Sequence, residues 1–125
     1  MNEVVLDASA LLALLEEGAN KVQGLLSRSI ISSVNFAEVV TRLAAIGMPK
    51  EEIRTVLSIL GLVIVPFDDE QAYFTGEIYP QTSHLGLSLG DRACLALAHI
   101  EGHIAITTDR AWAKLDSDLK VELIR

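Results

Sequence analysis

Cysteine and long apolar runs are almost absent from this chain. Cys94 is the only cysteine among the 125 residues, which excludes an internal disulfide and favours a reducing, cytoplasmic location over a secreted scaffold. The longest apolar stretch near the start, residues 8–15, is too short to span a bilayer, and Glu3 and Asp7 precede it rather than basic residues. We therefore expect neither a signal peptide nor a transmembrane helix.

Basic residues are also scarce. Ten Lys and Arg stand against 17 Asp and Glu, so the formal net charge is −7 and the basic footprint of a general nucleic-acid binder is missing. Divalent ions would offset a cluster of carboxylates locally, and a few arginines can attract a phosphate. The net charge therefore does not exclude an RNA or DNA substrate.

The chain has no internal repeats, linkers or low-complexity tracts. Its length predicts one compact domain over residues 1–125 with a single hydrophobic core. Half of the residues are apolar and the mean hydropathy is +0.38. Such a composition indicates a partner surface in addition to the core.

Short apolar runs alternate with helical patterns along the chain. Strands are predicted over residues 4–6, 30–31, 62–65, 104–106 and 121–124. Helices are predicted over residues 9–15, 22–26, 36–43, 49–60, 72–79 and 88–100, with a break at Gly18 and a short helix after 109. This alternation predicts an α/β fold with a central parallel sheet of about five strands and helices on both faces. Residues 80–86 are predicted to form an irregular loop and a mobile lid.

Four acidic residues follow predicted strands directly or closely: Asp7, Glu38, Asp91 and Asp109. In an open parallel sheet the ligand crevice lies outside the carboxyl ends of the strands, so these carboxylates can converge there. An all-oxygen site suits Mg²⁺ or Mn²⁺, and with such ligands these ions commonly serve phosphoryl or phosphodiester chemistry. The four acids are therefore candidates for one metal site.

Helix capping offers a competing explanation for three of these acids. Asp7 can cap the first helix, Asp109 can cap the short helix that carries Trp112, and Asp91 follows Ser88 with the spacing of a capping box. Each residue taken alone fits a structural role. A single metal site nevertheless accounts for all the acids together, whereas capping needs a separate cause for each one.

Glu38 has structural explanations of its own. It can occupy the third position of a helix that Asn35 caps, or it can pair with Arg42 one helical turn later. Either arrangement would explain Glu38 without a metal.

The four acids also lie within distinct short motifs. These motifs are residues 5–11 around Asp7, residues 33–39 around Glu38, residues 89–98 around Asp91 and residues 106–112 around Asp109. With them the chain resembles the PIN-domain ribonucleases, and specifically the toxins of VapBC-type toxin–antitoxin pairs, over nearly its whole length. The resemblance implies a PIN-like three-layer sandwich and a metal-dependent endoribonuclease that a cognate antitoxin restrains. It does not imply which RNA is cut.

The resemblance and the coordination chemistry of Mg²⁺ together suggest a role for each acid. Asp7 and Asp91 are expected to be direct ligands of Mg²⁺ or Mn²⁺. Glu38 and Asp109 are expected to be outer ligands or to position the attacking water.

Other polar residues near the motifs have more than one explanation. Thr107 corresponds to a hydroxyl residue that the family often keeps at its site, and with Ser9 it is expected to support the acids by hydrogen bonds. Arg92 and Arg110 can hold RNA phosphate, or they can be surface arginines and salt-bridge partners. His84 can touch the substrate from the predicted loop.

Two other classes of function compete with the nuclease. One is a catalytically silent PIN-like binding or regulatory module whose acids only cap helices, and a lack of stabilisation by Mg²⁺ or Mn²⁺ would identify it. The other is a receiver-like phosphoacceptor domain. That domain needs paired acids after the first strand and a late lysine, but only Asp7 follows the first strand, and the late candidate, Lys114, falls in a predicted helix.

Partner proteins are expected as well. The apolar excess and the family resemblance together predict a two-fold homodimer formed through helices that flank the sheet, and a separate groove for an antitoxin segment. A basic antitoxin residue is expected to reach the acids, where it would compete with the metal and occupy the phosphate position.

Overall fold

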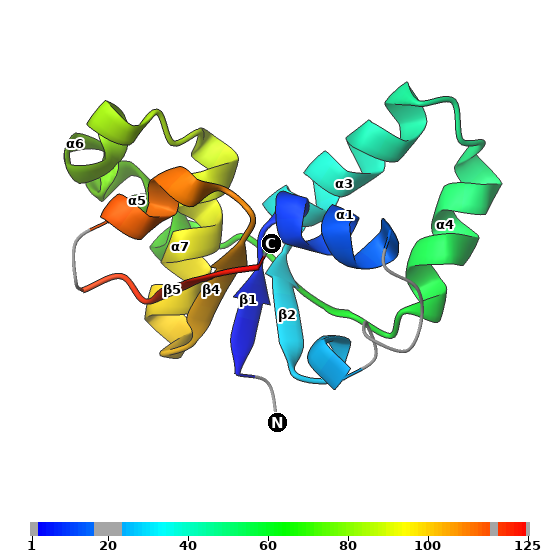
Figure 1. Cartoon of the computed structure of the whole chain (residues 1–125), viewed down its shortest axis with the longest axis horizontal. Helices are drawn as coiled ribbons and strands as arrows, with labels where there is room; N and C mark the ends of the chain where they lie inside the picture. The colour runs from blue at the N-terminus through cyan, green and yellow to red at the C-terminus, as the bar shows by residue number, and fades with distance from the viewer. Residues whose placement is uncertain (1–2, 17–23, 116–117, 125) are drawn as a thin grey trace.

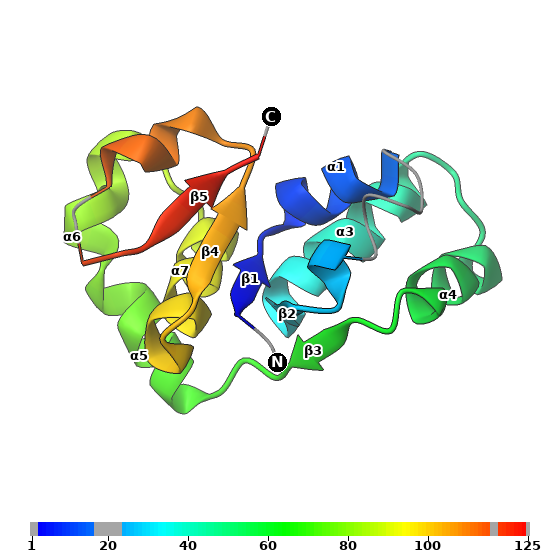
Figure 2. The same cartoon turned by 60° about the horizontal axis from the view of Figure 1, so that its bottom comes forward.

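Five parallel strands form the central sheet. The computed structural model describes residues 3–16, 24–115 and 118–124. The strands are β1 (Val4–Leu6), β2 (Ser29–Ser32), β3 (Val63–Val65), β4 (Ile104–Thr107) and β5 (Val121–Leu123), and Figure 1 shows the central ones edge to edge. All five lie side by side in the order β3-β2-β1-β4-β5, as Figure 2 shows. Every neighbouring pair is parallel, so the carboxyl ends of all five strands lie at one edge of the sheet.

Helices cover both faces of this sheet. One side carries α1 (Ala8–Glu16), α3 (Ser33–Ala45) and α4 (Lys50–Ile59), and the other carries α5 (Asp69–Glu77), α6 (Tyr79–Thr82) and α7 (Leu89–Glu101) (Figure 1). The short 3-10 helices η1 (Ser83–Leu85) and η2 (Arg110–Lys114) lie on the side of α7. The predicted α/β fold, with a five-stranded parallel sheet and helices on both faces, is confirmed.

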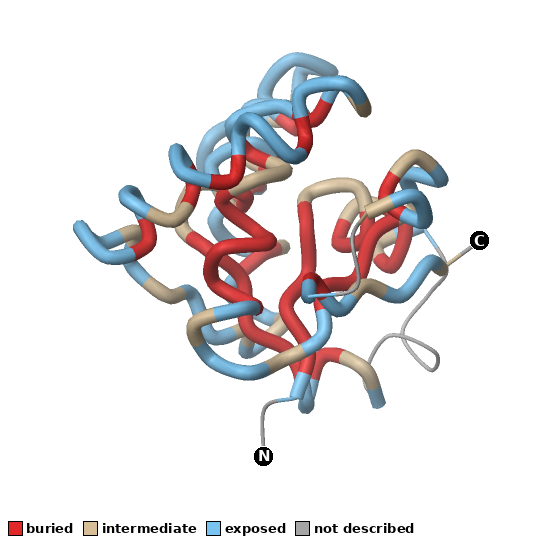
Figure 3. The backbone as a smooth tube through the Cα atoms, turned by 90° about the vertical axis from the view of Figure 1, so that its left-hand side faces the viewer, coloured by how far each residue is buried: buried red, intermediate tan, exposed pale blue. Residues whose placement is uncertain are grey.

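Side chains along the central strand point alternately to the two faces, and both faces are buried. Val4 and Leu6 pack into the core on the side of α1 and α3, while Val5 packs on the opposite side with Cys94 and Leu97 of α7. The two-residue period of a strand requires this alternation, and burial of both faces is typical of parallel sheets. The buried residues, red in Figure 3, run through the middle of the molecule beneath an exposed outer layer.

Local capping signals set the ends of the helices that approach the carboxyl edge. Ser32 caps α3 by accepting a hydrogen bond from the backbone N–H of Val34. Ser88 caps α7, and the same helix ends at Gly102, whose φ of 69° lies in the left-handed region that glycine adopts without a steric penalty. The cap at Ser88 was predicted from the sequence, because it depends on a neighbour only three residues away.

The prediction of an irregular loop over residues 80–86 is wrong, whereas a mobile lid at this place stays a prediction. This segment forms the short helices α6 and η1, and the fully buried Thr82 donates a hydrogen bond from its hydroxyl to the Ile78 carbonyl at 3.0 Å. Ile78 and Leu87 flank the segment and are both buried in the core beside α7. These two buried residues hold the segment between them in helical turns. The polar composition of the segment alone did not indicate a helical structure.

Two other expectations concern membrane spans and the segment around Gly18. Within them, no helix is long and apolar enough to cross a membrane. The predicted break at Gly18 and the start of the predicted helix at Val22 lie outside the described residues.

The core assignment makes a prediction about stability. Ile31 of β2 is 0% exposed, whereas Ile59 at the end of α4 is 76% exposed. We expect Ile31→Ala to lower the free energy of unfolding by about 2–5 kcal/mol, because a buried side chain is lost and a cavity remains. Ile59→Ala should change it by no more than about 0.5 kcal/mol. Urea unfolding of the two variants measures the difference, and equal losses would contradict this core.

Candidate active site

Polar groups gather at the carboxyl edge around the end of the central strand. Asp7 directly follows β1, and its backbone N–H donates to the Ile106 carbonyl of β4 at 3.0 Å. Thr107 is the last residue of β4 and is fully buried. Glu38 comes from α3 and Asp91 from the first turn of α7. Helices on opposite faces of the sheet therefore contribute to the same edge.

Asp7 is the most enclosed of the four acids, with an exposed fraction of 3%. Its Oδ1 accepts hydrogen bonds from Ser9 Oγ and from the backbone N–H of Ala10, both at 2.7 Å. Its Oδ2 accepts one from Thr107 Oγ1 at 2.5 Å, and Thr107 Oγ1 in turn accepts from the backbone N–H of Asp109 at 3.0 Å. These bonds fix the plane of the Asp7 carboxyl and join the ends of β1 and β4.

Capping of helices by Asp7, Asp91 and Asp109 is confirmed. Asp7 accepts from the third residue of α1, and Asp91 Oδ2 accepts from the backbone N–H of Ser88 at 2.8 Å within a complete capping box. Asp109 Oδ1 accepts from the backbone N–H of Ala111 at 2.9 Å at the start of η2. In Asp91 and Asp109 the cap occupies one carboxylate oxygen, so capping does not exclude a second role for the other oxygen.

Glu38 does not fit either structural alternative. Helix α3 begins at Ser33 with Ser32 as its cap, so Glu38 lies in the second turn and the predicted cap at Asn35 is wrong. Glu38 Oε1 accepts from Asn35 Nδ2 at 3.0 Å, and among the described residues no ion pair joins Glu38 to Arg42. Glu38 is the acid whose position the capping hypothesis leaves unexplained.

Asp7, Glu38 and Asp91 lie close enough to affect one another electrostatically. Burial raises the pKa of Asp7, the hydrogen bonds from Thr107, Ala10 and Ser9 oppose this, and the nearby Asp91 raises it further. Burial also raises the pKa of Glu38, the Asn35 hydrogen bond lowers it, and the charges of Asp91 and Asp7 add to the increase. Three of the four predicted acids therefore share one electrostatic environment.

Cys94 of α7 lies in the core close to these three acids. It is fully buried, and burial together with the charges of Asp7, Asp91 and Glu38 raises the pKa of its thiol well above the usual value. The thiol therefore stays protonated, and Cys94 is a core residue rather than a nucleophile.

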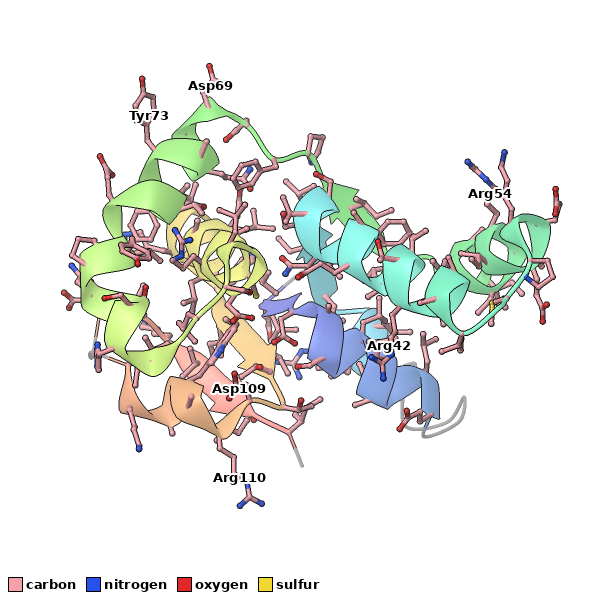
Figure 4. The ribbon with its side chains drawn as sticks, turned by 90° about the horizontal axis from the view of Figure 1, so that it is seen from above. Arg42, Arg54, Asp69, Tyr73, Asp109 and Arg110 are labelled. Atoms are coloured by element: carbon pink, nitrogen blue, oxygen red, sulfur yellow. The ribbon has the colours of Figure 1, made fainter. Side chains whose placement is uncertain are left out.

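Asp109 lies further from the other acids. It is exposed and caps η2, and it is not among the charges that shift the pKa of Asp7 or Glu38. Its backbone is nevertheless tied to the group through Thr107 Oγ1. Figure 4 shows Asp109 on the inward side of its segment, while the neighbouring Arg110 points away from the molecule.

Arg92 and His84, the other predicted substrate contacts, have no hydrogen bond to the acids among those described. Arg92 donates from Nη1 to the Thr75 carbonyl at 2.9 Å, and its guanidinium lies 5.1 Å from the centre of the Tyr79 ring. Arg92 therefore holds α5 and α6 against α7 through a backbone carbonyl and an aromatic ring, and among the described residues it forms no salt bridge. His84 is exposed on η1 rather than in a loop.

The oxygen ligands at this edge fit a hydrated divalent ion. The raised pKa values of Asp7 and Glu38 would be lowered by a nearby cation, which favours the ionised carboxylates. Among the described residues, no three His, Cys, Asp or Glu side chains are placed to hold one ion together. Mg²⁺ usually keeps several waters and takes only one or two carboxylates directly, so the site suits partial coordination through water.

The sequence matches the PIN domain over residues 4–118. The chain belongs to the PIN-domain family. It therefore does not belong to the receiver-like class, and Lys114 is an exposed residue on η2. Among curated protein sequences none matches this chain.

Several solved structures share this fold, and some of them are toxin–antitoxin proteins. The PIN-domain chain is similar to a chain of DNA-bound VapBC from Salmonella typhimurium, with 18% identity, a TM-score of 0.80 and coverage of 98% of both chains. It is also similar to VapBC-5 from Mycobacterium tuberculosis, with 24% identity, a TM-score of 0.63 and coverage of 98% of both chains. For FitAcB from Neisseria gonorrhoeae the identity is 21%, the TM-score 0.68 and the coverage 94% of this chain and 95% of that one. At these identities the similarity shows a common fold.

Two residues at the site were not found from the sequence. Asn35 was read only as a cap, although it is the hydrogen-bond partner of Glu38, and Gly90 lies against the Glu38 carboxylate. An asparagine three residues before an acid and a glycine just before Asp91 are common local patterns. Their meaning depends on a contact between α3 and α7, which lie far apart in the chain.

The raised pKa values of Asp7 and Glu38 predict a dependence of stability on pH. The ordinary values are 3.8 for Asp7 and 4.5 for Glu38, and folding raises both. A raised pKa contributes stability that is present below the ordinary value and is lost as the pH rises through the folded-state value. Metal-free protein should therefore lose stability relative to Asp7→Asn as the pH rises above the ordinary value of Asp7.

Urea unfolding of both proteins over this pH range measures the effect. Mn²⁺ favours the ionised carboxylates, so it should stabilise the wild type more at neutral than at acidic pH. A difference between wild type and Asp7→Asn that stays constant with pH would contradict the burial of an ionisable group at this position.

Proposed function

We propose that this PIN-domain protein is a Mg²⁺- or Mn²⁺-dependent endoribonuclease that hydrolyses RNA phosphodiester bonds and acts as the toxin of a toxin–antitoxin module. The observation that carries the proposal is the shared environment of Asp7, Glu38 and Asp91 at the carboxyl edge of the sheet. Membership of the PIN-domain family and the common fold with VapBC and FitAcB chains support it.

The acids take different parts in this proposal. Asp7 and Asp91 are the direct ligands, because they follow β1 and open α7 at the same edge. Glu38 and Asp109 act through water or position the attacking water. When bound, the ion polarises the phosphate and lowers the pKa of a bound water.

Hydroxyl groups keep the central ligand in place. Ser9 and Thr107 donate to opposite oxygens of Asp7, so the carboxylate cannot rotate freely. The Asp7 carboxylate is thereby oriented before metal and RNA arrive, which reduces the ordering needed during the reaction.

A silent binding module remains the second candidate, and one observation favours it. Asp7, Asp91 and Asp109 all cap helices, so the structure accounts for them without catalysis. The two functions differ in their response to divalent ions, because only a metal site gains stability and activity from Mg²⁺ or Mn²⁺.

The antitoxin segment is proposed to occupy an apolar groove. The groove lies between α3 and α4 beside β3 and has a volume of about 590 Å³, and the apolar residues that line it include Phe36, Val40, Met48, Leu57 and Ile64. Lys50 and Arg54 also line the groove, so it suits a segment with an apolar face and acidic neighbours. A basic residue further along the antitoxin would reach the acids. The homodimer and the cytoplasmic location belong to the same proposal.

Removing the charge of Asp7 tests the nuclease. Asp7→Asn keeps a capping oxygen but not the negative charge, so the purified variant should lose cleavage of RNA with Mg²⁺ or Mn²⁺ by at least about 100-fold, since residues that only orient ligands commonly cost 10–100-fold. Asp68→Asn is the matched control, because Asp68 caps α5 by accepting from the Gln71 N–H at 2.9 Å and lies on the surface. Near-normal cleavage by Asp7→Asn would remove Asp7 from the site.

A pair of neighbouring alanines tests the groove. Ala44 lines the groove, whereas Ala45 is the next residue of α3 and is exposed outside it. We expect Ala44→Glu to abolish co-purification with the product of the adjacent reading frame, because it places a charge in the apolar groove. Ala45→Glu should leave co-purification unchanged. Equal binding by both variants would place the antitoxin segment elsewhere, and light scattering of the same samples reports the dimer.

A further inference from the structure

The carboxylate of Glu38 lies directly against the first turn of α7. A Cβ atom added at Gly90 would lie 2.6 Å from Glu38 Cδ and still closer to both carboxylate oxygens. Gly90 is buried and immediately precedes Asp91. Only a residue without a side chain leaves room for the carboxylate at this place.

Asn35 holds the same carboxylate from its own helix. Asn35 is 1% exposed, and its Nδ2 donates to Glu38 Oε1 at 3.0 Å and to the Gly90 carbonyl at 2.9 Å. Both partners are acceptors, so the amide nitrogen must face them. The Asn35 Oδ1 is consequently buried and has no hydrogen-bond partner among the described residues, an unfavourable arrangement that the two donated bonds offset.

We infer that Asn35 and Gly90 are positioning residues for the Glu38 carboxylate. Asn35 ties α3 to the start of α7, and Gly90 provides the space into which Glu38 fits. Together they place the Glu38 carboxylate beside the first turn of α7, although Glu38 is an exposed residue, whereas a glutamate on an open helix face would move freely. The consequence for metal binding rests on the proposed function, whereas the contact itself does not.

The identity of residue 90 fits this role. Glycine in a helix is normally less favourable than alanine, so a helical glycine with open space around it gains from the replacement. Gly76 of α5 is such a glycine, because a Cβ there would meet nothing within 4 Å. At Gly90 the same replacement meets a flexible carboxylate, so the fold should persist while Glu38 is pushed out of place.

Metal-free urea unfolding separates the two glycines. We expect Gly76→Ala to raise the urea midpoint equally in the wild type and in Glu38→Ala. Gly90→Ala should raise the urea midpoint less, or lower it more, in the wild type than in the Glu38→Ala background. The reason is that Glu38→Ala has already removed the carboxylate that the added methyl group would meet. The same shift from Gly90→Ala in both backgrounds would overturn the positioning role.

The effect of this positioning on metal affinity is measured by Mn²⁺ titration, with electron paramagnetic resonance reporting the concentration of the free ion. Gly90→Ala and Asn35→Ala should each weaken Mn²⁺ binding by about 10–100-fold, the usual effect of residues that orient ligands. Neither should weaken it further in Glu38→Ala, and Gly76→Ala should have no effect. Unchanged Mn²⁺ binding by Gly90→Ala would overturn the inference. Absence of Mn²⁺ binding in the wild type would instead overturn the proposed function. The metal-free urea unfolding would then still test whether Gly90 and Asn35 position Glu38.

Discussion

The buried carboxyl of Asp7 is the group on which the rest of the carboxyl edge depends. It lies at the end of the central strand, and its hydrogen bonds reach Ser9 and Ala10 of α1 and Thr107 of β4. Burial of an acid is unfavourable, and these bonds compensate part of the desolvation. The same bonds fix the start of α1 and join β1 to β4, so the site and the fold share one group.

Capping and catalysis are compatible uses of the same acids. A carboxylate at a helix N-terminus is favoured by the free N–H groups and by the helix dipole, and parallel strands that feed helices place those termini at one edge. Asp7 at α1 and Asp91 at α7 therefore gain local stabilisation that offsets part of their mutual repulsion. Capping explains why acids can gather here, and it does not explain Glu38.

Glu38 is the acid that distinguishes the proposed metal site from a set of helix caps. It lies in the second turn of α3, beyond the first-turn backbone N–H groups that a capping side chain satisfies. Asn35 together with Gly90 holds it beside α7. The groove between α3 and α4 opens on the same helix. A segment bound in that groove would contact the helix that carries Glu38, which links the proposed antitoxin contact to the proposed catalytic group.

The sequence by itself determined the strands, most helices and the residues that follow the strands. These features depend on neighbours a few positions away, as the Ser88 and Asp91 capping box and the apolar runs of β1 and β4 show. The parallel sheet followed from the alternation of these elements. The tertiary structure decided what depends on distant contacts: the helical state of residues 79–85 between two core anchors, and the meeting of Asn35 with Gly90, 55 residues later. Such contacts form only when α3 and α7 pack together, because a buried amide or a missing Cβ has meaning only against the atoms that surround it.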